Sequence, residues 1–113
     1  MNAHGAVASY ALGEDVWEAV RRDWRTAPID ERLRATLGFL VQLTLRLDEL
    51  GRADADAARA AGVSDEALVD AIHVAALFNM IDRLADSIGW DVPSFEEFSG
   101  RAEAMLASGY ALE

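Results

Sequence analysis

The sequence predicts an all-α protein, a helical bundle of about six helices joined by short connections. Apolar residues recur at three- and four-residue spacing over most of the chain. β-branched residues are sparse, and no segment alternates apolar and polar residues with period two. With 113 residues, of which 52% are hydrophobic, the chain is long and apolar enough for a real core. We therefore expect residues 1–113 to form a single domain.

The longest predicted helix, residues 64–89, organises the chain. Ser64 is typical of an N-cap, and Gly89 is typical of the left-handed residue that ends a helix. Apolar residues occupy most of the circumference between them, which is typical of a central helix covered by its neighbours. These apolar residues are Leu68, Ala71, Ile72, Val74, Ala75, Ala76, Phe78, Ile81, Leu84 and Ala85.

Local start and stop signals predict the other helices. Pro28 ends one segment, and Asp30 is a good N-cap for the next. Ser94 and Glu97 have the spacing of a capping box, which predicts the start of the last helix. Glycines at positions 13, 62 and 109 close three of the segments. The predicted helices outside the long one span residues 1–12, 15–26, 30–44, 53–61 and 94–107.

Charge and composition exclude several classes of function. The net charge is −10 and all ten basic residues are Arg, so we expect no nucleic-acid partner and no binding to anionic membranes. The first residues lack a signal peptide and no apolar run is long enough to span a membrane, which favours a cytoplasmic protein. The chain contains no cysteine, which excludes disulfides, thiol nucleophiles and thiolate metal sites.

The only histidines are His4 and His73. His4 has the position of a solvated surface residue near the start of the chain. His73, in the middle of the long helix, is interpreted as a hydrogen-bonded histidine at the edge of the core or as part of a pocket or interface. Because no His-x₃-His or His-Glu-x₂-His spacing is present, we expect no metal site, and we expect no cofactor.

A second polar group on the long helix consists of Asn79, Asp82, Arg83 and Asp86. Asn79 and Arg83 are four residues apart, as are Asp82 and Asp86, so both pairs share a helix face. One interpretation is an exposed ion network worth a few tenths of a kcal/mol per pair. The other is a polar patch that lines a pocket or a subunit interface, because Asn79 and Arg83 stand between apolar residues.

Several segments together carry a resemblance to a known family. They are Asp30-Glu-Arg-Leu-Arg, Phe39 to Thr44, Ala58-Arg-Ala-Ala-Gly-Val-Ser-Asp-Glu-Ala-Leu68, Ala71-Ile-His, Phe78-Asn79 and Arg83-Leu-Ala-Asp-Ser-Ile-Gly89. From His4 to about Pro93 the chain resembles the carboxymuconolactone decarboxylase-like superfamily, in its alkylhydroperoxidase D-like, peroxidase-related branch. The resemblance implies an all-α, usually homo-oligomeric antioxidant oxidoreductase that reduces hydroperoxides.

The chain departs from this family at the residues that carry its chemistry. Family members use a Cys-x-x-Cys pair, then a His after three further residues, and an upstream Glu. His4 matches the motif histidine, and the second cysteine would then fall immediately before Met1. Both cysteines and the Glu are missing, and Asp82 stands where an Asn is expected. We therefore expect the domain to be N-terminally incomplete relative to the family and inactive as a thiol peroxidase on its own.

Two classes of function stay open. In the first, the chain belongs to the family's antioxidant chemistry, His4 is the surviving catalytic residue, and the DNA upstream encodes the cysteine pair in frame. In the second, it is a cysteine-free helical module that acts by oligomerisation or by binding a hydroperoxide or another small molecule. A decarboxylase reaction rests on the superfamily name alone, and no residue supports it.

Overall fold

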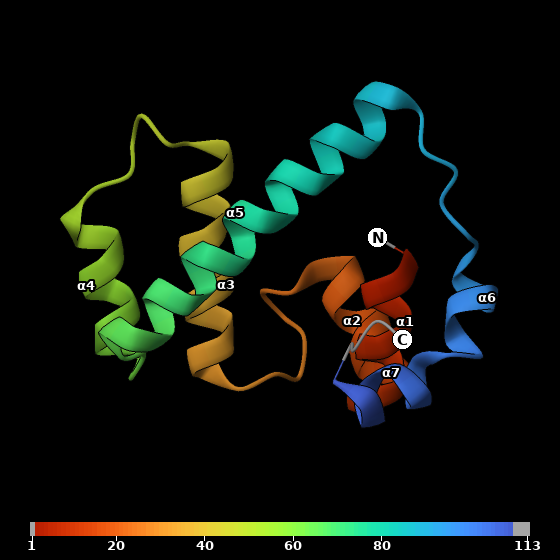
Figure 1. Cartoon of the computed structure of the whole chain (residues 1–113). Helices are drawn as coiled ribbons and strands as arrows, with labels where there is room; N and C mark the ends of the chain where they lie inside the picture. Colours follow the sequence, from red (N-terminus) through yellow and green to blue (C-terminus); the bar gives the residue numbers. More distant parts are fainter. Residues whose placement is uncertain (1, 110–113) are drawn as a thin grey trace. The chain divides into compact units, whose positions relative to one another are not determined.

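The computed structural model describes residues 2–109 and contains seven α-helices and no strand within that range (Figure 1). This confirms the all-α prediction. The longest helix is α5, at 24 residues. The elements are α1 (Asn2–Leu12), α2 (Glu14–Asp23), α3 (Glu31–Leu45), α4 (Arg52–Ala60), α5 (Asp65–Ile88), α6 (Phe95–Ser99) and α7 (Ala102–Ser108).

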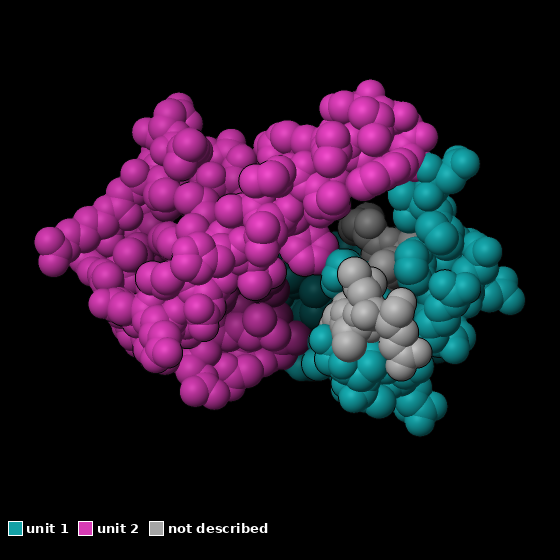
Figure 2. Space-filling view, viewed as in Figure 1, with its two compact units in different colours: residues 1–28, 91–113 teal, residues 29–90 magenta. Residues whose placement is uncertain are grey.

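The helices fall into two compact units, coloured separately in Figure 2. Unit 1 comprises the described residues of 1–28 and 91–113, and therefore holds α1, α2, α6 and α7. Unit 2 comprises residues 29–90 and holds α3, α4 and α5. The single domain expected from the sequence stays a prediction.

In unit 1, α1 packs against α2, α6 and α7. The buried residues are small, and among them Ala6 and Ala102 are 2% and 0% exposed. Gly5 lies against the Trp17 ring so closely that a Cβ atom there would stand 2.7 Å from Trp17 Cζ2. The approach of α1 to α2 therefore requires a glycine at this position.

In unit 2, the core lies where α3 meets α4 and the first turn of α5. Its buried side chains are Phe39, Ala58, Val63 and Leu68. Arg59 of α4 forms ion pairs with Asp56 and with Asp65, the first residue of α5, and so joins the two helices at the surface. One bulky aromatic and three smaller residues make this a small core, and α5 extends well beyond it.

The predicted ends of the long helix are confirmed. Ser64 Oγ accepts a hydrogen bond of 3.1 Å from the backbone N–H of Ala67, which satisfies one free donor of the first turn. Gly89 adopts φ 65° and ψ 47°, the left-handed conformation that glycine adopts without steric cost. Both signals act within a few residues, which explains why the sequence alone located them.

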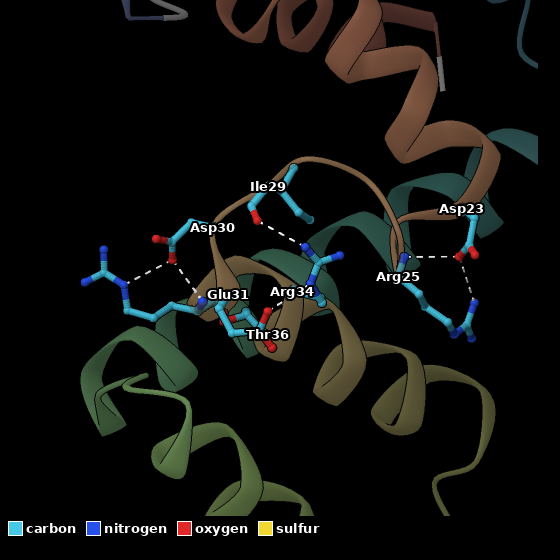
Figure 3. Close-up of polar contacts among 8 residues, drawn as sticks. Asp23, Arg25, Ile29, Asp30, Glu31, Arg34 and Thr36 are labelled. Atoms are coloured by element: carbon cyan, nitrogen blue, oxygen red, sulfur yellow. Dashed lines mark hydrogen bonds and ion pairs between the residues drawn. The ribbon is translucent and has the colours of Figure 1, made fainter.

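The start of α3 is also confirmed, and Figure 3 shows its polar contacts. Asp30 Oδ1 accepts hydrogen bonds from the backbone N–H of Arg32 at 2.9 Å and from Arg32 Nε at 3.2 Å. Arg34 Nη2 donates to the carbonyl oxygen of Ile29 at 3.2 Å, which anchors the segment before the helix. Asp30 is therefore a true N-cap.

The second helix ends earlier than predicted. α2 stops at Asp23, and the backbone N–H groups of Thr26 and Ala27 both donate to the Asp23 carbonyl oxygen at 3.1 Å in the turn that follows. Asp23 Oδ1 also accepts from the N–H of Arg25 at 3.1 Å (Figure 3). An Asp side chain that bonds the backbone two residues on favours a turn over a further helical turn.

The predicted last helix is two helices. The capping box at its start is confirmed, since Ser94 Oγ accepts from the Glu97 N–H and Glu97 Oε2 accepts from the Ser94 N–H. The chain then breaks at Gly100 and Arg101, between α6 and α7. Glycine costs about 1 kcal/mol relative to Ala inside a helix, and this weakness allows the break. The sequence interpretation overlooked it.

Within unit 2, the neighbouring helices cover less of α5 than the sequence predicts. Of its residues only Leu68 is buried, and much of the apolar surface predicted to face other helices is exposed. α5 contacts α3 along one side of unit 2. A helix that is apolar on most sides does not specify which of them its neighbours will cover. Within the described residues, no helix combines the length and apolarity needed to cross a membrane.

Candidate functional site

A groove of about 290 Å³ runs between α3 and α5 in unit 2. α5 contributes both polar and small apolar residues to it, while α3 and the turn after it contribute leucines and a threonine. Its volume is close to the lower limit of small-molecule sites, which begin at roughly 300 Å³. The lining residues are Leu43, Thr44, Leu47, Ile72, Ala75, Ala76, Asn79 and Arg83.

Asn79 and Arg83 form the polar end of this groove. Asn79 Nδ2 donates to the Ala75 carbonyl oxygen at 2.9 Å, one helical turn earlier. Arg83 Nη1 donates both to the Asn79 carbonyl oxygen and to Asn79 Oδ1, each at 3.0 Å. The guanidinium is thus folded back along α5 and fixed to Asn79, which explains the four-residue spacing of the pair.

Arg83 keeps donors that nothing in the described residues uses. A guanidinium has five N–H donors, and only those of Nη1 are engaged. No carboxylate among residues 2–109 forms an ion pair with Arg83, although Asp82 and Asp86 lie close in sequence. Six other arginines do form ion pairs: Arg21, Arg25, Arg32, Arg34, Arg52 and Arg59. Nε and Nη2 of Arg83, a residue that lines the groove, therefore have no partner among residues 2–109.

A second cavity of about 510 Å³ lies near the starts of α3 and α5. Its only cation, Arg32, is already paired with Asp30 at 3.2 Å. The hydrogen bonds from Arg32 hold the pKa of the Asp30 carboxyl below its ordinary value, so Asp30 stays negatively charged. Ser64 there caps α5. This cavity is larger, but the charge of its arginine is balanced by Asp30, and we do not assign it a ligand.

The structure brings together only two of the predicted site residues. Asn79 and Arg83 line the groove, while His73 and Asp82 are exposed on α5 and do not line it. His4 is exposed on α1 and belongs to unit 1. Within residues 2–109, no group of three or more histidine or acidic side chains could hold a metal ion.

The residues that the sequence interpretation missed are those that α3 brings to the groove. Leu43 and Leu47 line it, and Leu47 lies in the turn after the helix, between the predicted helices of residues 30–44 and 53–61. Only the packing of α3 on α5 places them beside Asn79. The lining contains a hydroxyl, an amide and a guanidinium but no carboxylate, imidazole or thiol, and this set suits binding rather than acid–base catalysis.

Comparison with the models of known protein families and with curated proteins finds no match to this chain. The fold and the absence of cysteine are established, and no family assignment follows from them. The resemblance to alkylhydroperoxidase D-like proteins stays a hypothesis.

Proposed function

We propose that the protein is a cysteine-free helical binding module that holds a small monocarboxylate with a short apolar chain in the groove between α3 and α5. The observation that carries this proposal is the fixed guanidinium of Arg83, whose Nε and Nη2 donors have no partner in the described part of the chain. An arginine edge of this kind matches the two oxygens of a carboxylate.

The rest of the groove supplies the complementary apolar surface. Leu43, Leu47 and Ile72 provide bulk, while Ala75 and Ala76 leave room for a ligand along α5. The chain's charge of −10 opposes anions at long range, so the attraction must come from Arg83 within a few ångströms. A compact ligand with one carboxylate and few carbon atoms fits both the volume and the charge.

The alternative function, antioxidant hydroperoxide reduction, is supported by the segments that resemble alkylhydroperoxidase D-like proteins. That chemistry needs a thiolate to attack the peroxide and a second thiol to resolve the sulfenic acid. The 113-residue sequence contains neither. The binding proposal rests on the arrangement of the groove residues and not on the family resemblance, and for that reason it is preferred.

Titration of the protein with octanoate, followed by amide NMR shifts, tests the proposal. We expect saturable shifts at residues around Asn79 and Arg83, and binding weakened about tenfold by Arg83→Gln, because a charge-assisted hydrogen bond contributes roughly 1.5–3 kcal/mol and part of this is lost to solvent screening. 1-Octanol, which has the same chain without the charge, should bind more weakly than octanoate.

Arg46→Gln is the matched control, because Arg46 is exposed in the same unit, follows α3 and does not line the groove. It should leave the octanoate affinity unchanged. Equal affinities for octanol and octanoate, or an unchanged affinity in Arg83→Gln, would contradict the proposal.

A further inference from the structure

α5 carries an exposed apolar stripe on the side opposite to α3. At about 100° per residue, the residues that face α3, such as Leu68, Ile72 and Asn79, fall on one side of the helix. The stripe falls on the other side, and its side chains are between 44% and 67% exposed. We define it by its members: Val74, Leu77, Met80, Ile81, Leu84 and Ile88.

The spacing within the stripe is that of a coiled coil. Positions 74, 77, 81, 84 and 88 alternate steps of three and four residues, as the a and d positions of a heptad repeat do. The a positions are all β-branched, namely Val74, Ile81 and Ile88, and both d positions are leucine. This combination favours parallel two-stranded pairing. A straight helix drifts only about 20° per heptad, so the two heptads remain on one face.

The charges of this segment lie away from the stripe. In the same heptad register, Asp82, Arg83 and Asp86 occupy the b, c and f positions. The flanking e and g positions between residues 71 and 88 contain no Asp, Glu, Lys or Arg. In a chain with a net charge of −10, most surfaces of two copies repel each other. An uncharged stripe is a surface along which two copies can approach without like-charge contacts.

We propose that a second copy of this chain covers the stripe, with the two α5 helices paired in parallel about a twofold axis. A twofold interface places the same patch of both copies in contact, so the patch must be self-complementary. A row of alternating β-branched and leucine side chains meets this condition, because each inserts between its counterparts on the partner helix. The pairing also carries no helix-nucleation cost, since packing on α3 already forms α5.

The area of the stripe sets the strength of the proposed dimer. A side chain of this kind offers on the order of 100 Å² of apolar surface, and about half remains accessible here, so two copies bury roughly 600 Å² through the stripe alone. Flanking residues such as Phe78 and Ser87 add to this. This area is below the about 1,200 Å² of stable specific interfaces and therefore predicts a weak, concentration-dependent dimer.

Sedimentation equilibrium of the full chain tests the proposal. We expect a shift from 12.3 kDa toward twice that mass over the micromolar range. Leu77→Glu places a like charge in both copies at a d position of the stripe and should weaken the dimer about a hundredfold. The control, Leu45→Glu, changes another exposed leucine outside the stripe and should leave the dimer intact.

Disulfide trapping tests the parallel register. Since the sequence has no cysteine, any disulfide must come from the introduced residue. In a parallel dimer in register, both Leu77→Cys and Leu84→Cys bring two sulfurs together across the axis, and each variant should form a covalent dimer under mild oxidation. Asp86→Cys, at an f position, should not.

Several outcomes would overturn the proposal. A chain that stays monomeric at about 100 µM has no such interface. A dimer that survives Leu77→Glu uses another surface, and trapping at only one of the two leucines indicates a different register or antiparallel helices. The groove lies on the opposite side of α5, so Leu77→Glu should leave octanoate binding unchanged and the two proposals can fail independently.

Discussion

At Gly5, the absence of a side chain decides how closely two helices approach. The residue is buried in α1, and the nearest atoms belong to the Trp17 ring of α2. Because an aromatic ring in a packed interface cannot bend away, an added methyl group must push the helices apart. Nothing in the local sequence distinguishes this glycine from one that ends a helix.

We therefore predict that Gly5→Ala destabilises the protein. The overpacking costs about 1–3 kcal/mol, and the better helix propensity of Ala returns less than about 1 kcal/mol. Gly100→Ala is the matched control, because Gly100 has helical angles of φ −65° and ψ −14° and an added Cβ would stand 3.9 Å from the nearest atom. It should be neutral or stabilising.

Urea unfolding followed by circular dichroism measures both variants. Equal effects of the two substitutions on the free energy of unfolding would contradict the close packing of Gly5 on Trp17.

At the scale of single elements, the capping box stabilises the start of the short helix α6. Glu97 accepts hydrogen bonds from both the backbone N–H and the hydroxyl of Ser94, at 2.7 Å and 2.9 Å. These bonds, the backbone one first, favour the carboxylate and lower the pKa of Glu97 below its ordinary value. Five residues form too short a helix to persist without such a cap.

A pH dependence follows from the lowered pKa. Protonating Glu97 is harder in the folded chain than in the unfolded chain. The stabilisation that the Glu97 carboxylate gives to the folded chain is therefore complete above the pKa of Glu97 in the unfolded chain. It is lost as the pH falls through the lower folded pKa. Gln can form the same capping box without titrating. We predict that the difference in unfolding free energy between the native protein and Glu97→Gln shrinks from about pH 7 to about pH 3.

Urea unfolding of both proteins at each pH measures this difference. Because the other carboxylates are the same in both proteins, their contribution to the pH dependence cancels. A difference independent of pH would mean that the Glu97 carboxylate makes no stabilising contact with Ser94.

At the scale of the whole molecule, the absence of cysteine limits the chemistry more than any feature of the fold. Thiol peroxidases need a sulfur nucleophile, and an imidazole such as His4 moves protons but cannot accept the peroxide oxygen as a thiolate does. A helical fold by itself says nothing about which of these groups is present.

We predict that the pure chain shows no turnover of cumene hydroperoxide with a dithiol reductant, above the rate of the reductant alone. In a second variant, a Cys-x-x-Cys segment is added so that it ends immediately before Met1. This extension places His4 at the spacing of the family motif. The variant should gain turnover if the chain is related to that family by descent. Robust turnover by the unextended chain, without added metal, would contradict the prediction.

The sequence by itself determined the all-α class, the ends of α5 at Ser64 and Gly89, and the starts of α3 and α6. Each of these depends on hydrogen bonds between residues within four positions of each other, which the order of residues already specifies. It also determined that Asn79 and Arg83 share a face of α5.

Only the tertiary structure decided which faces are covered. α5 is apolar around most of its circumference, so its sequence allowed either side to pack on a neighbour, and packing on α3 chose one. That choice brought Leu43 and Leu47 beside Arg83 to form the groove, and left Leu77 and Ile81 exposed. Segments that are distant in sequence compete to cover the same apolar surface. The free energy of burial depends on the contacts between them, which no local pattern specifies.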